Sequence, residues 1–235
     1  MKKIKIPYYK QSDQEGCGAA AISMALIACG ISIPQEEILH SILKKHNQSD
    51  KKNTFTHDMC SFLFDKGAYP IYVGGLNDVK TWNLLKTYVR KGFPLIALQR
   101  YSLRNSRSHF RVITGHEFIN EKHKIYFHDP IDGKDQSLMK DKFFDLWKHE
   151  PGSDQLRINE LVVIKKKPFS IPKTHCNFCQ STSIKKMILD NSVIPKEYSF
   201  INPSTKFEST CMQFVCNSCG VNYIFNEKLR INHNS

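Results

Sequence analysis

The chain has 235 residues, of which 40% are apolar and 24% charged, a composition that suits one ordinary globular domain with a smaller one attached. Lys and Arg number 34 against 22 Asp and Glu, and the surplus of 12 positive charges favours polyanions or acidic peptides as partners without deciding the fold. No segment reaches the length of about eighteen apolar residues that a transmembrane helix requires, and the basic start MKKIKIPYYK lacks the apolar run of a signal peptide.

Helical patterns dominate the first third of the chain. The run from Cys17 to Cys29 is apolar on every side and is followed by Gly30, which predicts a helix buried in the middle of a domain. A second helix is predicted to start at Ser32, because Gln35 completes a capping-box pattern. Two further helices are predicted over about 57–66 and 77–91, ended by Gly67 and Gly92.

Beyond Gly92 the sequence favours β-strands. The predicted strands are PLIALQ (94–99), HFRVITGH (109–116), KIYFHDP (124–130) and LRINELVVI (156–164), with a helix over SLMKDKFFDLWK (137–148) between the last two. The connection INEKHK between the second and third strands is typical of a hairpin, so these two strands should be antiparallel. Helices followed by an antiparallel sheet predict an α+β domain.

Composition changes near residue 166, where IKKKPFSIPK carries two prolines and four lysines. We therefore predict one domain over residues 1–165, a linker over 166–174 and a small second domain over 175–235.

Cys17 is a candidate nucleophile because of its position at the start of the first helix. The partial positive charge of a helix N-terminus stabilises a thiolate, and the flanking Gly16 and Gly18 leave the sulfur accessible to a substrate. Cys29 and Cys60 lie within apolar helical patterns and are expected to be buried and inert.

A thiol nucleophile in acyl transfer needs a base, a group that orients the base, and donors for the oxyanion. His109 at the start of one predicted strand and Asp129 at the end of the next would be brought together by the hairpin, and Gln11 could supply an amide donor beside the N–H of Cys17. His116 and His128 are alternative bases, and Asp129 could instead serve only to begin the turn DPIDG.

Residues 5–165 resemble the papain-like cysteine peptidases that process bacteriocins by cutting after a double-glycine leader. The resemblance lies in Gln11 followed six positions later by Cys17-Gly18, in GFPLIAL, and in SHFRVITGHE followed by YFHDPIDG. It implies a papain-like fold with Cys17 as nucleophile, His109 as base and acid, Asp129 as the orienting residue and Gln11 as oxyanion-hole donor. Gly16 stands where many members carry an acidic residue, and the transporter attached to the type members is absent.

The segment RYSLRNSRSHFR (100–111) holds four arginines. It could form a basic rim beside the active site that favours acidic groups in a substrate, or an ordinary solvated loop with interspersed charges.

Two C-x-x-C pairs in the second predicted domain, CNFC and CNSC, provide four thiolates of the kind that close a structural zinc site in a zinc ribbon. Metal binding would supply the folding free energy that so small a core lacks. The predicted ligands are Cys176, Cys179, Cys216 and Cys219. Cys211 and His175 are alternative ligands, and a disulfide is the alternative if the protein is exported.

The preferred hypothesis is a cytosolic cysteine peptidase that acts on a peptide or protein and whose zinc ribbon positions the substrate or a partner. An acyltransferase, deamidase or transglutaminase would share the acyl-enzyme and differ only in the acceptor. A different class of function is a catalytically silent scaffold whose zinc ribbon binds nucleic acid or protein, although no dense basic stripe favours nucleic acid. Export without a cleavable signal also remains open.

Overall fold

The computed structural model describes residues 2–45, 56–73, 78–147 and 159–166, together with residue 182 and three further strands. Its elements in chain order are β1 (Lys2–Lys3), α1 (Cys17–Ala28), α2 (Gln35–Lys45), α3 (Thr56–Asp65), β2 (Tyr69–Val73), α4 (Asp78–Lys91), β3 (Leu95–Ser102), β4 (Asn105–Ile119), β5 (Lys122–Asp129), β6 (Gly133–Met139), α5 (Lys140–Asp145), β7 (Glu160–Lys165), β8 (Ile184–Leu189), β9 (Cys211–Cys216) and β10 (Asn222–Asn226).

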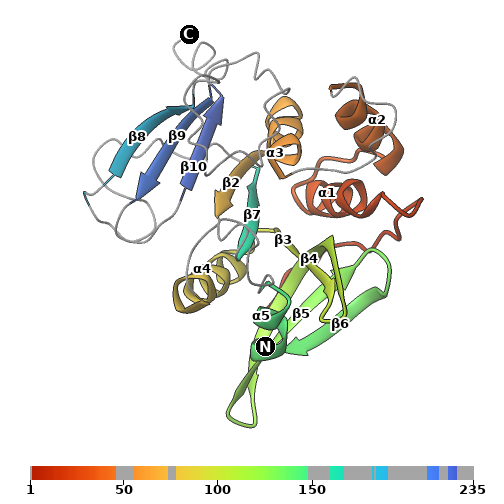
Figure 1. Ribbon diagram of the computed structural model, residues 1–235, viewed down its shortest axis with the longest axis vertical. Helices are drawn as coiled ribbons and strands as arrows, with labels where there is room; N and C mark the ends of the chain where they lie inside the picture. Colours follow the sequence, from red (N-terminus) through yellow and green to blue (C-terminus); the bar gives the residue numbers. More distant parts are fainter. Residues whose placement is uncertain are drawn as a thin grey trace.

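A seven-stranded antiparallel sheet organises the first 165 residues. Its order is β2-β7-β3-β4-β5-β6, and β1 pairs with β4 off this path. Helices α1, α2 and α3 lie on one side of the sheet and α4 and α5 on the other (Figure 1). The predicted α+β class, with helices before an antiparallel sheet, is therefore confirmed.

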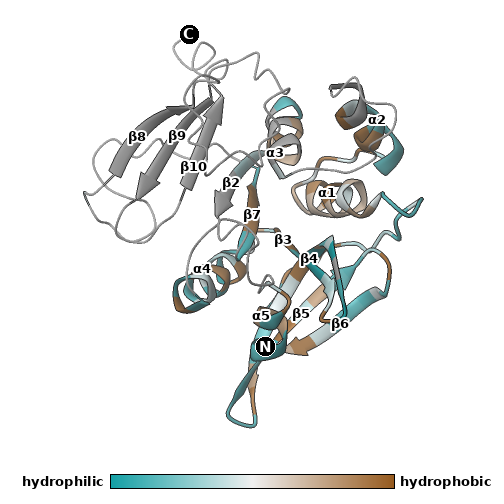
Figure 2. Ribbon diagram, in the orientation of Figure 1, coloured by the Kyte–Doolittle hydropathy of each residue, from teal (hydrophilic) through white to brown (hydrophobic). Residues whose placement is uncertain are grey.

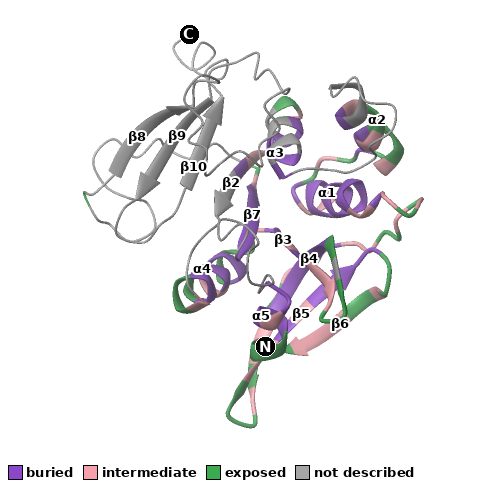
Figure 3. Cartoon of the chain, in the orientation of Figure 1, coloured by how far each residue is buried: buried purple, intermediate pink, exposed green. Residues whose placement is uncertain are grey.

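Alternation along the strands divides the hydrophobic core into two layers. On β3, Ile96 packs with α1, α2 and α3, whereas its neighbours Leu95 and Ala97 pack with α4 and α5. The inner strand β7 faces both layers, so between its charged ends it is hydrophobic in Figure 2, and all of it but Lys165 is buried in Figure 3.

Helix α1 has the burial that its sequence predicts. All its residues from Gly18 to Leu26 are buried, and no side faces solvent over that length. The glycines predicted to end three of the helices, Gly30, Gly67 and Gly92, have φ values of +80°, +77° and +77°, a conformation that side chains disfavour.

Two predicted helix starts are wrong. Helix α2 begins at Gln35 rather than Ser32, because the side chain of Gln35 does not complete a capping box but bonds the backbone of Ser12 and Lys10. The helix predicted from Ser137 begins only at Lys140, because Ser137 and the two residues after it pair with β5 as the end of β6.

The predicted hairpin between β4 and β5 is confirmed. Its two turn residues, Asn120 and Glu121, have positive φ values of 46° and 60°, as the commonest two-residue hairpin turns require. The strands β1, β2 and β6 were not predicted. The last of these reads GKDQSLM and lies at an edge of the sheet, where a polar strand is tolerated and leaves no hydrophobic pattern.

Strands β8, β9 and β10 form a separate antiparallel sheet in the order β10-β9-β8. The predicted zinc ligands Cys176, Cys179 and Cys219 lie outside the described residues, and only the backbone of Cys216, at the end of β9, is described. Within the described part of the chain, no group of three or more His, Cys, Asp or Glu could hold a metal ion, and no helix is long and apolar enough to cross a membrane.

Candidate active site

Cys17 is the first residue of α1, and no side chain offsets the partial positive charge at this end of the helix. Gly16 occupies the N-cap position without a side-chain cap, and the first turn contains no acidic residue. The N–H groups of the first turn have no partner within a helix, so they present partial positive charge. Cys17 itself is partly exposed, unlike the buried Cys29 and Cys60. Burial raises the pKa of the Cys29 thiol, as expected for an inert cysteine.

The turn before Cys17 is compact because its own side chains fold back on it. Asp13 Oδ1 accepts the N–H of Glu15 at 2.8 Å, and Gln11 Nε2 donates to the carbonyl of Asp13 at 2.5 Å. A Cβ atom at Gly16 would lie 3.2 Å from Asp13 Oδ1 and 3.6 Å from Gln11 Cβ. A residue larger than glycine would therefore crowd the turn.

Gln11 is held beside this turn from two directions. Its backbone N–H donates to the carbonyl of Pro130 at 3.1 Å, which joins it to the loop that follows Asp129. Gln35 Oε1 accepts the N–H of Ser12 at 3.1 Å, and Gln35 Nε2 donates to the carbonyl of Lys10 at 2.9 Å. Gln11 Nε2 uses one of its two hydrogens on Asp13, so a second remains for another acceptor.

His109 is buried between two partners. Its side chain is 3% exposed, and its Nε2 lies 2.7 Å from Asp129 Oδ1. This contact leaves Nδ1 as the ring nitrogen that can exchange a proton with Cys17, whose side chain is close enough to interact with the ring. Burial lowers the pKa of His109, but the interactions of the ring with Asp129 and Cys17 outweigh it, and the pKa is raised above its ordinary value of 6.5.

Asp129 is a buried carboxylate whose Oδ1 accepts hydrogen bonds and whose Oδ2 forms an ion pair. Besides His109, its Oδ1 accepts the N–H groups of Ile131 at 2.9 Å and Asp132 at 3.1 Å. Its Oδ2 lies 2.8 Å from Arg111 Nε in an ion pair. Burial alone would raise the pKa of Asp129, but the hydrogen bond and charge of His109, the charge of Arg111 and the N–H of Ile131 lower it to about 2.

The register of the β4–β5 hairpin brings these side chains together. Val112 pairs with His128, so the preceding Arg111 is opposite the following Asp129. His109 is two residues from Arg111 and points to the same face of the sheet. The predicted meeting of His109 and Asp129 is therefore present in the structure, but Arg111, not His109, is the direct cross-strand neighbour of Asp129.

Tyr101 covers the ring of His109. The two ring centroids are 5.2 Å apart with an interplanar angle of 86°, and the Tyr101 hydroxyl donates to Asp132 Oδ1 at 2.9 Å. Neither contact follows from an obvious motif. The signal in the sequence is the spacing, since Gln99 pairs with His109 and Tyr101 follows two residues later on the same face.

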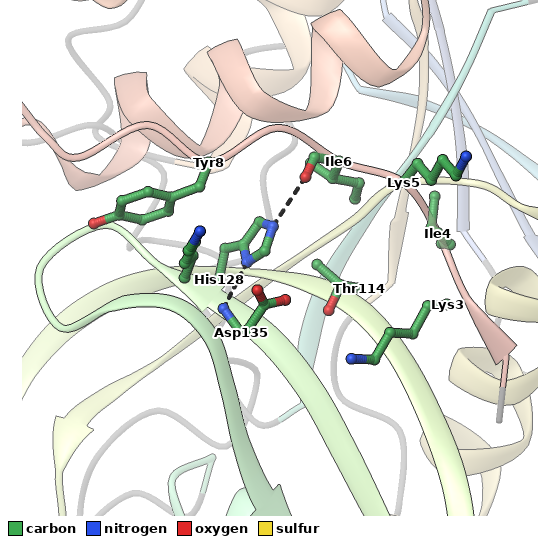
Figure 4. A pocket seen from close by; sticks show the side chains of 9 residues that line it. Lys3, Ile4, Lys5, Ile6, Tyr8, Thr114, His128 and Asp135 are labelled. Carbon is green, nitrogen blue, oxygen red and sulfur yellow. Dashed lines mark hydrogen bonds between the residues drawn. The ribbon is translucent and has the colours of Figure 1, made fainter.

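The two alternative bases lie elsewhere. Figure 4 shows His128 in a pocket of about 240 Å³, where its Nε2 faces the carbonyl of Ile6 at 3.0 Å and its Nδ1 accepts the N–H of Asp135 at 3.0 Å. His116 packs edge-on against Trp82 with ring centroids 5.6 Å apart. Both imidazoles therefore make their contacts away from Cys17.

The arginine-rich segment (100–111) has an exposed turn, but it is not a single loop. It forms the end of β3, a tight turn and the start of β4, and its arginines contact different parts of the protein. Arg100 Nη2 donates to the carbonyl of Asp145, Arg107 Nη2 pairs with Glu15 at 3.0 Å, and Arg111 is buried against Asp129. Both sequence interpretations missed the internal role of Arg111.

Most of residues 1–165 is similar to known proteins. The model of the Peptidase_C39 like family matches residues 3–152. Among solved structures, the peptidase domain of Streptococcus ComA, a bifunctional ABC transporter of a quorum-sensing pathway, is 15% identical, with a TM-score of 0.50 over 71% of this chain and 100% of that one.

A double glycine motif protease from an AMS/PCAT transporter, solved with its leader peptide, is 19% identical, with a TM-score of 0.45 over 70% of this chain and 94% of that one. No curated protein matches the sequence significantly.

Proposed function

The chain belongs to the Peptidase_C39 like family of papain-like cysteine peptidases, and we propose that it cleaves peptide bonds through an acyl-enzyme formed on Cys17. The observation that supports this role best is the place of His109, whose Nε2 lies 2.7 Å from Asp129 Oδ1 and whose ring also interacts with Cys17. A base that contacts the nucleophile on one side and its orienting group on the other has the arrangement that thiol-dependent acyl transfer needs.

In the proposed mechanism His109 takes the proton of Cys17, and the thiolate attacks the carbonyl carbon of the peptide bond. The electron pair of the carbonyl moves to oxygen, and the oxyanion accepts hydrogen bonds from the N–H of Cys17 and the free hydrogen of Gln11 Nε2. Protonated His109 then gives its proton to the leaving amine as the C–N bond breaks.

Water completes the cycle in the second half of the reaction. His109, neutral again, takes a proton from water while the oxygen attacks the thioester, and the same proton returns to the sulfur of Cys17 as the acid product leaves. Asp129 keeps Nε2 of His109 protonated, so Nδ1 is the nitrogen that exchanges protons with Cys17 and the substrate.

The alkylation rate of Cys17 by iodoacetamide tests this proposal without a known substrate. We expect Cys17 to react about tenfold or more faster than Cys29 and Cys60 below pH 7, since only a thiolate stabilised by protonated His109 is nucleophilic there. His109→Ala should remove this advantage. The rates are read by mass spectrometry of the modified peptides, and the two buried cysteines serve as internal controls. Equal rates for all three thiols in the wild type would contradict the proposal.

We also propose that the C-terminal residues hold a structural zinc ion on Cys176, Cys179, Cys216 and Cys219 and position a substrate or protein partner. The support is the spacing of the two C-x-x-C pairs together with the position of the second pair. Cys216 is the last residue of β9, and β10 begins at Asn222, so the second pair joins two antiparallel strands, as a zinc knuckle does in a ribbon.

A further inference from the structure

Arg111 gives Asp129 a second cationic partner. The Arg111 side chain is 4% exposed, and its Nε lies 2.8 Å from Asp129 Oδ2, whereas His109 contacts Oδ1. Its other two nitrogens donate to the carbonyls of Arg100 at 3.0 Å and Tyr101 at 2.7 Å. All three nitrogens therefore have partners, and the side chain is fixed in one position.

This arrangement has an electrostatic consequence for the base. A guanidinium stays charged even when burial lowers its pKa, as it does for Arg111, because its ordinary pKa lies far above neutral pH. When His109 is protonated, one carboxylate is shared between two cations in a region of low dielectric. The positive charge of Arg111 therefore opposes the proton on His109, although Asp129 favours it.

We propose that Arg111 is a positioning residue that neutralises Asp129, so that Asp129 orients His109 without holding its proton too strongly. The inference rests on the proposed roles of Cys17, His109 and Asp129. Catalysis requires His109 to give its proton to the leaving amine and then to act as a base towards water. A carboxylate without a counter-charge would stabilise the protonated ring at the expense of both steps.

A purely structural role for Arg111 is the competing explanation, since it also ties the end of β3 to β4 through two carbonyls. The two explanations differ in their effect on the titration of His109. Loss of a structural contact would lower stability and activity at every pH, whereas loss of the counter-charge would move the pH at which His109 gives up its proton.

The test is an NMR titration of the His109 ring in the full-length ¹⁵N-labelled protein, with the signal assigned by its absence in His109→Gln. We expect the midpoint to rise by about one pH unit in Arg111→Gln, a tenfold change in the equilibrium, and to return towards the wild-type value in Arg111→Lys, which restores the charge. Arg104→Gln is the matched control, because it removes one charge from the exposed turn of the same segment.

An unchanged midpoint in folded Arg111→Gln would overturn the inference, as would an equal shift in Arg111→Lys and Arg111→Gln. If Arg111→Gln alone does not fold, the double variant Asp129→Asn/Arg111→Gln is compared with Asp129→Asn. Asp129→Asn leaves the guanidinium unopposed and should lower the midpoint, and the addition of Arg111→Gln should raise it again. Equal midpoints in Asp129→Asn and the double variant would contradict the proposal.

The alkylation of Cys17 in the wild type separates this inference from the proposed function. An unreactive Cys17 would reject the peptidase mechanism, whereas a reactive Cys17 with an unshifted His109 midpoint would reject only the role of Arg111.

Discussion

All contacts of the Asp129 side chain favour its ionised carboxylate. His109 and two backbone N–H groups bond its Oδ1, Arg111 forms an ion pair with its Oδ2, and its pKa is lowered to about 2. A lowered pKa means that the unfolded chain binds a proton more readily than the folded one below pH 4. The stability that Asp129 contributes is therefore complete above its ordinary pKa of 3.8 and is lost as the pH falls towards 2.

A substitution of Gln11 tests its proposed role as a hydrogen-bond donor to the oxyanion. Loss of one oxyanion donor costs about 10²–10³-fold in kcat, so Gln11→Ala should lower kcat by that factor and change KM little once a peptide substrate is available. Gln14→Ala is the matched control, because Gln14 lies in the same turn and is exposed. An increase in KM with kcat unchanged would instead indicate that Gln11 binds the substrate and does not stabilise the oxyanion. The same assay, followed by analysis of products, distinguishes water from an amine as the acceptor.

At the level of elements, α4 packs on the β4–β5 hairpin through a cluster of aromatic and imidazole rings. Trp82 of α4 contacts His116 of β4 and His123 of β5, with ring centroids 5.6 Å and 4.8 Å apart. Burial lowers the pKa of both histidines, and the nearby charges of Lys86 and other basic groups lower it further. Protonation of either ring therefore works against this packing.

The sign of the resulting pH dependence follows from these lowered pKa values. Below pH 6.5 the unfolded chain gains protons that the folded chain resists, so stability that is complete above pH 6.5 falls as the solution is acidified. We expect the urea midpoint of the wild type to drop between pH 7.5 and 5.5, and to drop less in His116→Phe/His123→Phe. His40→Phe, on the exposed side of α2, should behave as the wild type. Equal drops in all three proteins would show that the cluster does not govern acid stability.

At the level of the whole molecule, we expect the papain-like part and the C-terminal sheet to be stabilised by different means. The seven-stranded sheet is covered by helices on both sides, whereas β8, β9 and β10 form a three-stranded sheet for which a metal site is proposed. A sheet of this size gains much of its stability from a bound metal where one is present.

Zinc removal tests this proposal. We expect about one zinc ion per chain by elemental mass spectrometry, and its loss in Cys216→Ser. A strong chelator should make the residues after 166 sensitive to protease while the alkylation rate of Cys17 stays the same. Cys211→Ser is the control for ligand choice, since Cys211 is the alternative ligand on the same strand. One zinc ion retained in Cys216→Ser would reject the predicted ligand set, and its loss in Cys211→Ser would identify the alternative.

The sequence alone determined the local features of this protein. The uniform apolar run and the following Gly30 predict α1 with Cys17 at its start, and the alternating segments with a short polar connection predict the β4–β5 hairpin. These features depend on periodicity and turn conformation, which neighbouring residues decide. Family resemblance then supplied the order of Gln11, Cys17, His109 and Asp129 along the chain.

Only the tertiary structure decided how charged and polar residues are paired. Arg111 stands in a segment of four arginines and resembles a surface residue in the sequence, but the hairpin register places it opposite Asp129 in the interior. Gln35 resembles half of a capping box, but it bonds the backbone on both sides of Gln11. A polar side chain can be satisfied by many partners, and the choice among them depends on which distant segments folding brings within hydrogen-bonding distance.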